Sequence, residues 1–530
     1  MYDYVIVGAG SAGCVLAARL TEDPDVSVLL LEAGPPDANQ NIHVPLGYLK
    51  LAGTEIDWNY FSAPEPHCNG RRIPLPRGRV LGGSSSTNAM VYIRGNPRDY
   101  DDWGIPGWSW ADLFPYFVKA EDNERGASEW HGAGGPLPVS EQRSGNAISR
   151  AWVEAAVQAG VPRNDDFNGA AQDGAGMYQV TQRGGLRASA AAAYLHPASA
   201  RPNLHVLTHM LVHRVLFEGT RAIGVEASQL GHVQELRAQR EVILCGGAYN
   251  SPQLLMLSGV GPADHLLLRE LEVVLDQPAV GANLSDHAAT YAVWGTERPE
   301  SLLLAREPAA LEEFMASQTG PLASNLAESG AFVRVEPDAP APDVQFHAIP
   351  VQILEEGTAD PEGHGVLVTP CLLTPEARGS VRLASNDPTA RPLVRNDFYA
   401  SERDLERMVA ALRLTLEISG QPAMAPYCTT GMVVPDDDSE EALRAHARRT
   451  TFAIYHPVGT CALGSVVDEQ LRVNGLEALR VVDASVMPVV PRGNTNAPTI
   501  AIAERAADLI RGSSPRAAAA SVLSPPSAPA

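Results

Sequence analysis

The sequence predicts an α/β fold built around a Rossmann-like dinucleotide-binding unit. Residues 4–7 are an apolar run typical of a buried strand. A GxGxxG motif follows at once, with its glycines at Gly8, Gly10 and Gly13. Residues 14–20 suit a helix, and residues 26–31 are a second apolar strand that ends at an acid, Glu32. GxGxxG alone is a weak signal, but strand, turn, helix, strand and acid in this order are typical of a dinucleotide site.

The residues of this unit have separate physical roles. Gly8 allows the tight turn, Gly10 lets a pyrophosphate approach the backbone, and Gly13 lets the helix pack closely against the strand. Glu32 follows Gly13 by 19 residues. A carboxylate at that place accepts hydrogen bonds from a ribose 2′-hydroxyl and repels a 2′-phosphate. The predicted cofactor is therefore a dinucleotide without a 2′-phosphate.

Beyond this unit, loops rich in Pro and Gly alternate with short regular elements. Alternating β-branched residues predict successive strands over 203–217 and 222–245. Further elements are expected as strands at 330–335 and 343–351, and as helices at 401–419, 440–449 and up to Ile510. Residues 513–530 are rich in Ala, Ser and Pro with almost no charge, so we expect a disordered tail.

Length and charge narrow the class of protein. The 530 residues carry 40 Lys and Arg against 62 Asp and Glu, a formal charge of −22, and only Lys50 and Lys119 are lysines. An acidic chain lacks the basic footprint of a nucleic-acid binder. Two lysines and no GxxxxGK[ST] motif disfavour Schiff-base and P-loop chemistry. The length allows roughly two to four domains.

Cysteine usage and the start of the chain predict the compartment. The 6 cysteines include no CxxC pair and do not suggest a disulfide framework. The chain runs directly into an apolar strand, without the basic and apolar regions of a signal peptide. No apolar run reaches the roughly 18 residues of a membrane span. These features predict a cytoplasmic protein without a membrane span.

Two polar clusters are better explained by structure than by metal binding. His205, His209 and His213 are spaced by four, but on the predicted strand they would extend over about 13 Å, too far for one metal ion. The acids of 436–441 surround Ser439, a plausible N-cap for the next helix. We therefore predict no metal site. No HExxH, GxSxG or EF-hand motif is present to support a hydrolase.

The region near the C-terminus holds a candidate ligand site. His456 lies in a loop next to Pro457 and Gly459, and a strand ending at Asp483 is followed by the polar turn residues 492–499. Polar residues before a helix N-terminus suit a polar or anionic ligand group. Composition alone does not make His456 catalytic, because a lone histidine is more often structural.

Five segments, in order, resemble the glucose–methanol–choline (GMC) family of flavin oxidoreductases. They are residues 3–13 with 31–34, 77–91 (RGRVLGGSSSTNAMV), 246–261 (GGAYNSPQLLMLSGVG), 455–460 (YHPVGT) and 482–498 (beginning VDASVMP and ending NTNAP). The resemblance extends from residue 3 to about residue 510, and its two long signatures are highly specific.

The resemblance implies a Rossmann-like FAD-binding domain and an interleaved α+β substrate-binding domain on a mostly antiparallel sheet. The implied FAD-binding domain is discontinuous and comprises residues 1–150, 195–295 and 450–512. The implied substrate-binding domain comprises residues 151–194 and 296–449.

The resemblance also implies the cofactor contacts. The residues expected to hold FAD are Gly8, Gly10, Ser11, Gly13, Glu32, Ala33, Val80, Gly83, Ser84, Asn88, Ala89, Met90, Val91, Val212, Asp483, Ala484 and Thr499. Some family members bind the flavin covalently through a histidine of the GGxSxxN loop. That position is Thr87 here, so we expect non-covalent FAD.

His456 and Asn496 match the catalytic pair of the family. A neutral imidazole, with an ordinary pKa near 6.5, is suited to take the hydroxyl proton of an alcohol, and FAD accepts the hydride. Many members have a second histidine where this chain has Asn496. An amide cannot act as a base, so this role is expected of His456 alone, and Asn496 is expected to hold the alkoxide.

The expected activity is oxidation of a small alcohol to an aldehyde by a choline dehydrogenase-like enzyme. The electron acceptor is expected to be O2 or a quinone- or dye-like molecule. The alternatives are a non-redox member such as a hydroxynitrile lyase, a light-driven fatty-acid decarboxylase and a flavoprotein without catalysis. The His456 pair favours alcohol oxidation over the decarboxylase. Glu328 is a candidate partner for a cationic substrate, but a structural acid explains it equally well, so it has no assigned role.

Overall fold

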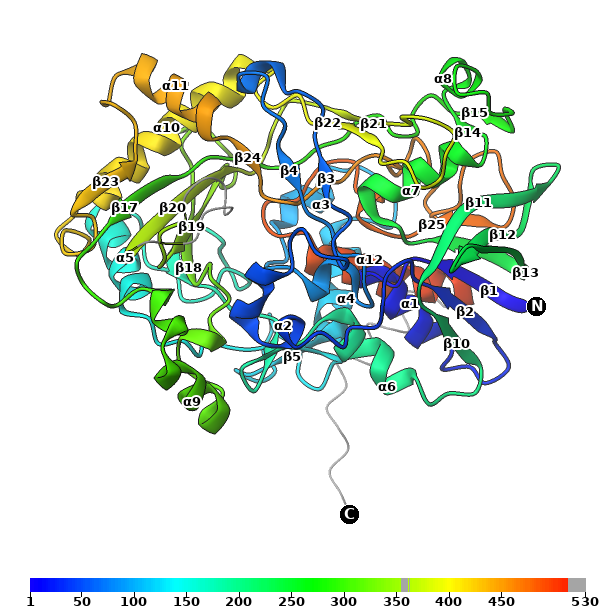
Figure 1. Cartoon of the computed structure of the whole chain (residues 1–530), viewed down its shortest axis with the longest axis horizontal. Coiled ribbons are helices and arrows are strands. Elements are labelled where there is room, and N and C mark those ends of the chain that lie inside the picture. The colour runs from blue at the N-terminus through cyan, green and yellow to red at the C-terminus, as the bar shows by residue number, and fades with distance from the viewer. Residues whose placement is uncertain (354–360, 362, 513–530) are drawn as a thin grey trace.

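The glycine-rich turn at Gly8 connects the central strand of a sheet to the first helix. In the computed structural model, which describes residues 1–353, 361 and 363–512, β1 (Tyr2–Val7) leads into α1 (Ser11–Leu20), and β2 (Val28–Leu31) lies parallel to β1. Strands buried on both faces need continuous apolar sequence, and residues 4–7 and 28–31 supply it. The predicted βαβ unit is present (Figure 1).

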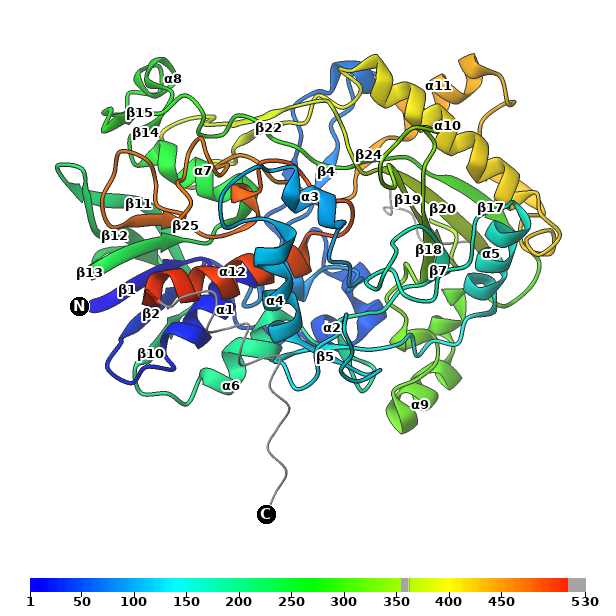
Figure 2. The same ribbon diagram turned by 180° about the vertical axis from the view of Figure 1, so that it is seen from behind.

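The first sheet is parallel on one side and antiparallel on the other. Its strand order is β10-β2-β1-β13-β12-β11, and β25 pairs with β13. The remaining bounds are β10 (Leu204–Leu207), β11 (Met210–Glu218), β12 (Arg221–Gln229), β13 (His232–Leu244) and β25 (Leu479–Val481). The parallel strands lie beside α1 and the last helix, α12 (Asn496–Arg511), which contact each other (Figure 2).

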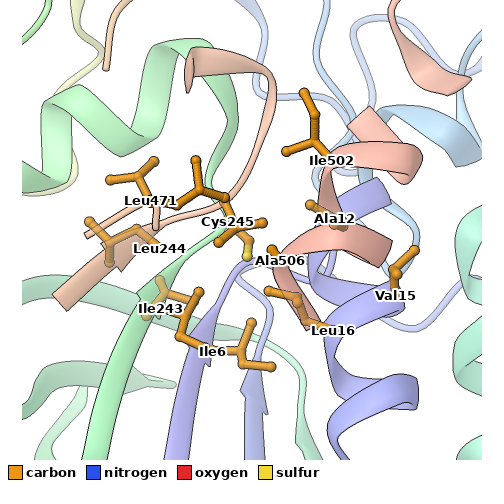
Figure 3. Close-up of a cluster of buried hydrophobic side chains, with 14 of the residues drawn as sticks. Ile6, Ala12, Val15, Leu16, Ile243, Leu244, Cys245, Leu471, Ile502 and Ala506 are labelled. Atoms are coloured by element: carbon orange, nitrogen blue, oxygen red, sulfur yellow. The ribbon is translucent and has the colours of Figure 1, made fainter. Parts of the chain in front are cut away.

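A buried cluster of apolar side chains joins this sheet to the two helices. Ile6 and Ile243 from the sheet face Leu16 of α1 and Ala506 of α12 (Figure 3). All of these side chains are buried. The chain's N-terminal and C-terminal elements are thus held in one core, which places the start of α12 next to the glycine-rich turn.

The second sheet is antiparallel and lies on the opposite side of the molecule from the first (Figure 1). Its order is β23-β17-β20-β19-β18-β7, with β16 between β20 and β24. The bounds are β7 (Gly174–Met177), β16 (Ala288–Ala289), β17 (Ala292–Gly295), β18 (Ser329–Val333), β19 (Val344–Ile349), β20 (Gly365–Leu372), β23 (Thr430–Val433) and β24 (Phe452–Ala453). Helices α5 (Ala147–Gln158) and α10 (Glu402–Ser419) pack against β18 and β20.

Shorter elements complete the fold. The helices are α2 (Gln40–His43), α3 (Pro97–Asp101), α4 (Trp110–Ala120), α6 (His196–Ala198), α7 (Gly247–Leu257), α8 (Ala263–Leu267), α9 (Pro308–Ser317) and α11 (Glu440–Thr450). The paired short strands are β3 (Tyr60–Phe61) with β4 (Pro74–Leu75), β5 (Glu121–Asn123) with β6 (Leu137–Val139), β8 (Gln182–Arg183) with β9 (Leu186–Arg187), β14 (Val260–Gly261) with β15 (Leu275–Asp276), and β21 (Ser380–Arg382) with β22 (Leu393–Arg395). Among helices in the described residues, none has the length and apolar character needed to cross a bilayer.

The α/β fold class is confirmed, whereas some element boundaries differ from the sequence prediction. The strand expected over 203–217 is two strands, because His209 has a positive φ of 56° and turns the chain from β10 into β11. The strand expected over 222–245 is a hairpin of β12 and β13. The helices expected at 401–419 and 440–449 are α10 and α11.

The two sheets do not follow the domain limits expected from the sequence. Strands β16, β17 and β24 belong to the antiparallel sheet, although 195–295 and 450–512 were expected in the FAD-binding part. The limit at residue 150 falls inside α5, which packs on that same sheet. Residues 513–530 lie outside the described residues.

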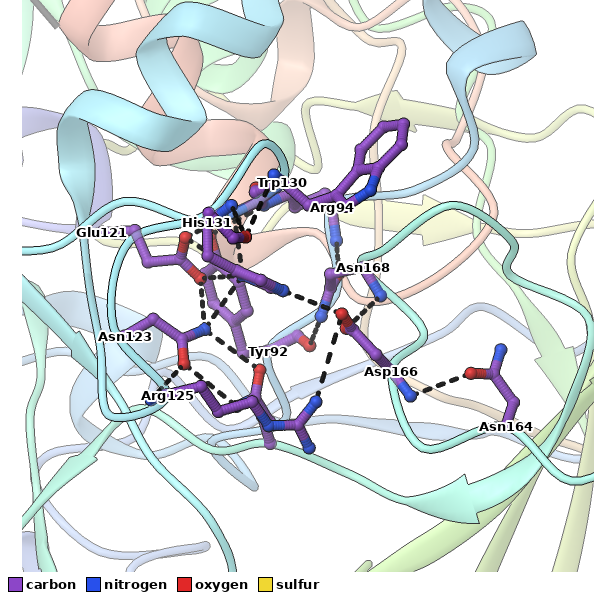
Figure 4. Close-up of polar contacts among 12 residues, drawn as sticks. Tyr92, Arg94, Glu121, Asn123, Arg125, Trp130, His131, Asn164, Asp166 and Asn168 are labelled. Carbon is purple, nitrogen blue, oxygen red and sulfur yellow. Dashed lines mark hydrogen bonds and ion pairs between the residues drawn. The ribbon is translucent and has the colours of Figure 1, made fainter. Parts of the chain in front are cut away.

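A buried polar network ties together three loops beside the two sheets (Figure 4). The Glu121 carboxylate pairs with the Arg94 guanidinium, and His131 Nδ1 lies 3.1 Å from Glu121 Oε1. On its other side, His131 Nε2 lies 2.9 Å from Asp166 Oδ2. Burial opposes a charge on His131, but its hydrogen bonds to Asp166 and Glu121 outweigh this and raise its pKa to about 9. His131 is therefore an imidazolium at neutral pH.

Candidate active site

A cavity of about 550 Å³ extends from the glycine-rich turn to the antiparallel sheet. Its wall includes Gly10 at one end and His456 further along, followed by strands β19 and β20. It joins the predicted nucleotide site to the predicted catalytic histidine within one continuous space.

The glycine-rich turn forms the first part of the wall. A Cβ atom on Gly8, whose φ is +101°, would lie 2.5 Å from the Cys245 carbonyl oxygen, and one on Gly13 would lie 1.9 Å from the Gly8 oxygen. Side chains are thus excluded at both positions. Gly10 lies on the cavity wall, and a Cβ there would meet only the Cys245 oxygen at 4.0 Å. The Gly10 backbone therefore faces open space, as close approach of a pyrophosphate requires.

Three helices begin at this wall. Ser11 opens α1, Gly247 opens α7 and Asn496 opens α12, and all three residues line the cavity. Helix N-termini present N–H groups and a partial positive charge, which suits a phosphate, although at α7 the first N–H already donates to Asp483. This convergence, together with the open backbone at Gly10, fits a pyrophosphate-containing cofactor.

Glu32 lies where the sequence predicts a ribose partner. Its Oε2 accepts from the Ala9 N–H and its Oε1 from the Gly34 N–H, both at 2.9 Å. Each carboxylate oxygen retains a further lone pair, and Glu32 and Ala33 lie on the cavity wall together with Val212. Burial raises the pKa of Glu32 to about 7. Through its remaining lone pairs the Glu32 carboxyl group can accept hydrogen bonds from ribose hydroxyls while it holds the turn.

The loop between residues 83 and 91 forms the next part of the wall. Asn88 Oδ1 accepts from the Met90 N–H at 3.0 Å and from Arg187 Nη1 at 2.7 Å. Met90 has a positive φ of 58°, which turns the loop along the cavity. The predicted cofactor residues on the wall here are Gly83, Ser84, Asn88, Ala89, Met90 and Val91, and Thr87 also lines it.

Two predicted cofactor residues are not on the wall. Val80 packs behind it, in a buried cluster with Ile42, Leu51 and Ile56. Gly13 lies inside the turn, where it allows close packing without facing the cavity.

The segment that begins at Asp483 closes this side of the cavity. Asp483 Oδ2 accepts from the Gly247 N–H at 2.9 Å and from Ser251 Oγ at 2.6 Å, so it holds the start of α7. Ala484 and Thr499 lie beside it on the wall. The structure brings these predicted residues together with the glycine-rich turn.

His456 lies at the catalytic end, 8% exposed. Its Nε2 accepts from Asn494 Nδ2 at 3.1 Å, and its Nδ1 lies 3.0 Å from His287 Nδ1. Burial, reinforced by nearby His287, His347 and Arg77, holds the pKa of His456 well below its usual value. The ring is therefore neutral at neutral pH, as a proton acceptor must be.

The predicted partner Asn496 does not pair with His456. It is the first residue of α12, and its Oδ1 accepts from Ser11 Oγ at 2.8 Å at the nucleotide end. Asn494, two residues earlier, has its amide beside His456. The side chain that meets His456 in the structure is therefore that of Asn494, and not that of the predicted partner Asn496. Asn494 and His287 were not among the residues predicted from the sequence; the signal for Asn494 was its place in the same NTNAP segment.

The far wall comes from the antiparallel sheet. Because side chains alternate between the faces of a strand, His347 and Ile349 of β19 line the cavity, while Phe346 and Ala348 pack in the core on the other face. Glu328 is not on this wall: its carboxylate accepts from Ser149 Oγ at 2.6 Å and from Ser324 Oγ at 2.5 Å. Because both of its carboxylate oxygens bond to serine hydroxyls inside the protein, Glu328 has the contacts of a structural acid.

The histidines spaced by four do not gather. His205 stacks edge-on against Tyr2, and His213 Nε2 lies 2.8 Å from Ser228 Oγ. Within the residues that the structure describes, no group of three or more His, Cys, Asp or Glu is arranged to hold a metal.

A glycine-rich turn that suits a dinucleotide lies on the same cavity wall as a buried, neutral histidine. This combination is typical of one class of protein: an oxidoreductase that holds its cofactor against an oxidisable substrate. Comparisons with known proteins identify the family. GMC oxidoreductase models match residues 2–289 and 375–503. The chain belongs to the GMC oxidoreductase family.

Several relatives are similar over nearly the whole chain. The oxygen-dependent choline dehydrogenase of Pseudomonas syringae pv. syringae (strain B728a) is 45% identical, covering 97% of this chain and 94% of the relative. The mitochondrial choline dehydrogenase of Mus musculus is 43% identical, covering 96% of this chain and 89% of the relative.

Solved structures agree. Pyridoxine 4-oxidase from Mesorbium loti superposes with a TM-score of 0.89 at 32% identity, covering 97% of this chain and 100% of that chain. A formate oxidase variant from Aspergillus oryzae RIB40 superposes with a TM-score of 0.89 at 26% identity, covering 96% and 98%. The prediction of a choline dehydrogenase-like, FAD-dependent enzyme that oxidises CH–OH donors is confirmed.

Proposed function

We propose that His456 is the base that takes the hydroxyl proton of an alcohol, which leaves as an aldehyde. The observation that carries this proposal is the neutral, buried imidazole whose Nε2 meets Asn494 on the cavity wall. FAD, when bound, supplies the two-electron oxidant that accepts the hydride. The predicted cofactor residues on the cavity wall, which begin at Gly8 and include the loop up to Val91, hold the cofactor. The walls around the buried His456 exclude water.

Asn494 has the complementary role in this proposal. In the structure its Nδ2 donates to His456 Nε2. An alcohol oxygen placed between the two groups would accept from Nδ2 while its proton faces Nε2, so Asn494 can hold the developing alkoxide in place. Its Oδ1 accepts from Gln345 Nε2 at 3.3 Å, which orients the amide. An amide cannot accept the proton, so the two side chains divide positioning from proton transfer.

The substrate is a small alcohol, and choline is the first to test because two of the relatives are named choline dehydrogenases. The electron acceptor is O2 or a quinone-like molecule; one relative is named oxygen-dependent and one neighbour is an oxidase. The 6 free cysteines suit a reducing compartment, for which we propose the cytoplasm, although one relative is named mitochondrial.

Alcohols are expected to reduce the bound flavin in the absence of O2. Anaerobic enzyme is mixed with choline, aliphatic, aromatic and other amino alcohols, and the visible flavin absorbance is followed. At least one class should bleach it, with formation of the matching aldehyde. No bleaching by any class would contradict the proposal and favour a lyase or a non-catalytic flavoprotein. Comparing peroxide yield with dye reduction then distinguishes an oxidase from a dehydrogenase.

FAD is expected to be released when the protein is denatured. Thr87 lies on the cavity wall at the position where some family members have a flavin-bound histidine, and a threonine hydroxyl does not form that linkage. Acid precipitation should therefore leave the yellow colour in the supernatant. Colour retained in the washed pellet would contradict a non-covalent cofactor.

A further inference from the structure

A second buried histidine, His287, contacts the proposed base, His456, on its Nδ1 side. The rings of His287 and His456 meet edge to face, with centroids 5.2 Å apart and planes at 90°, and the two Nδ1 atoms are 3.0 Å apart. His287 is fully buried. The proton transfer proposed above has no direct use for this ring, because it lies on the side of His456 away from Nε2.

The hydrogen-bond partners determine which nitrogen of each ring carries the proton. A neutral imidazole has one donor and one acceptor nitrogen. Asn494 Nδ2 can only donate, so His456 Nε2 is the acceptor. The proton of His456 is then on Nδ1, which donates to His287 Nδ1. Burial lowers the pKa of His287 to about 3, so this ring stays a neutral acceptor.

The backbone holds the two rings in this position. One oxygen of Asp286, Oδ1, accepts from the N–H groups of both His287 and His456, each at 2.8 Å. Ser285 and Val458 exchange backbone hydrogen bonds on one side, and the Ile454 N–H donates to the His287 carbonyl on the other. Between them Tyr455 has a positive φ of 68°. Residues with backbone conformations of this strained kind cluster at functional sites.

We propose that His287 is a positioning residue that holds His456 in the Nδ1-protonated tautomer, with the Nε2 lone pair on the side of Asn494 and the cavity. This inference rests on the proposed role of His456 as the base. When His456 accepts the substrate proton on Nε2, it becomes an imidazolium whose Nδ1–H still donates to neutral His287. That bond becomes charge-assisted and is then roughly twice as strong as a neutral one. The other groups that face His456 are His347, Arg77 and Asp286.

The test compares His287→Leu, which removes the acceptor, with His287→Asn, whose Oδ1 can take the place of the imidazole Nδ1. His287→Leu should slow anaerobic flavin reduction by about 10- to 100-fold, the loss expected for one charge-assisted hydrogen bond. His287→Asn should recover most of the rate. His446→Leu is the control, because His446 is a buried histidine that is not itself on the cavity wall and whose ring is bonded to the Tyr291 carbonyl at 2.8 Å. An equal loss in His287→Asn and His287→Leu would overturn the proposal.

A second readout does not depend on turnover. The holoenzyme is labelled with ¹⁵N-histidine, and the His456 signals among the 14 histidines are identified by their loss in His456→Gln. We expect the shifts of an Nδ1-protonated ring in the wild type and in His287→Asn, and a changed tautomer in His287→Leu. An Nε2-protonated His456 in the wild type would overturn the inference. Failure of every alcohol to reduce the wild-type flavin would instead contradict the proposed function, and the tautomer measurement would still decide this inference.

Discussion

Replacing His456 by alanine is expected to slow flavin reduction by alcohol by about 10²- to 10⁴-fold, the usual contribution of a general base. The alcohol would keep its place in the cavity but lose the group that takes its proton, so the rate constant for reduction should fall far more than substrate affinity. The measurement is anaerobic stopped-flow reduction over a range of alcohol concentrations.

FAD content should stay unchanged in His456→Ala, because the turn at Gly8 and Gly10 and the carboxyl group of Glu32 make no contact with the His456 ring. His232→Ala is the matched control, since His232 is an exposed histidine at the start of β13. A variant that binds FAD and is reduced at the wild-type rate would show that His456 is not the base.

Local sequence was sufficient for the nucleotide end of the site. The turn at Gly8, Gly10 and Gly13 and the acid at Glu32 lie within one βαβ unit, so spacing along the chain already determines their relative positions. The resemblance added His456 and the loop before Val91. Residues whose contacts are local, or whose segment is long and specific, could therefore be placed before the structure was known.

The sequence-based expectations that differ from the structure concern residues whose positions depend on packing between distant segments of the chain. Asn494 and Asn496 are two residues apart, and only the start of α12 decides that Asn496 turns to Ser11 while Asn494 meets His456. His287 is 169 residues from His456 in the chain. Their contact depends on the pairing of β16 with β24, and strand pairing over such a separation has no local signal. The same pairing places β16 and β24 in the antiparallel sheet.

Replacing Arg94 by methionine is expected to destabilise the protein by about 3 kcal/mol, the lower end of the cost of breaking a buried ion pair, because Glu121 keeps the His131 imidazolium as a partner. Arg94 is 1% exposed and Glu121 is 0% exposed. The Arg94 side chain also contacts the residue that follows the loop of residues 83–91: its Nε donates to the Tyr92 hydroxyl at 3.2 Å. Weaker FAD retention should therefore accompany the loss of stability.

Chemical denaturation of Arg94→Met, Glu121→Leu and the double variant separates the causes. Arg94→Met leaves Glu121 with His131 as its remaining charged partner, and Glu121→Leu leaves the buried Arg94 charge without a carboxylate. The double variant removes both charges of the pair, so its loss should be smaller than the sum of the two. Arg163→Met is the matched control: Arg163 Nη2 is 2.6 Å from Glu154, but the two side chains are 50% and 51% exposed, and exposed pairs contribute about 0–1 kcal/mol. If Arg94→Met loses no more stability than Arg163→Met, the Arg94–Glu121 pair is not what holds these loops together, and the order of the loop of residues 83–91 must depend on Arg187 and Asn88 instead.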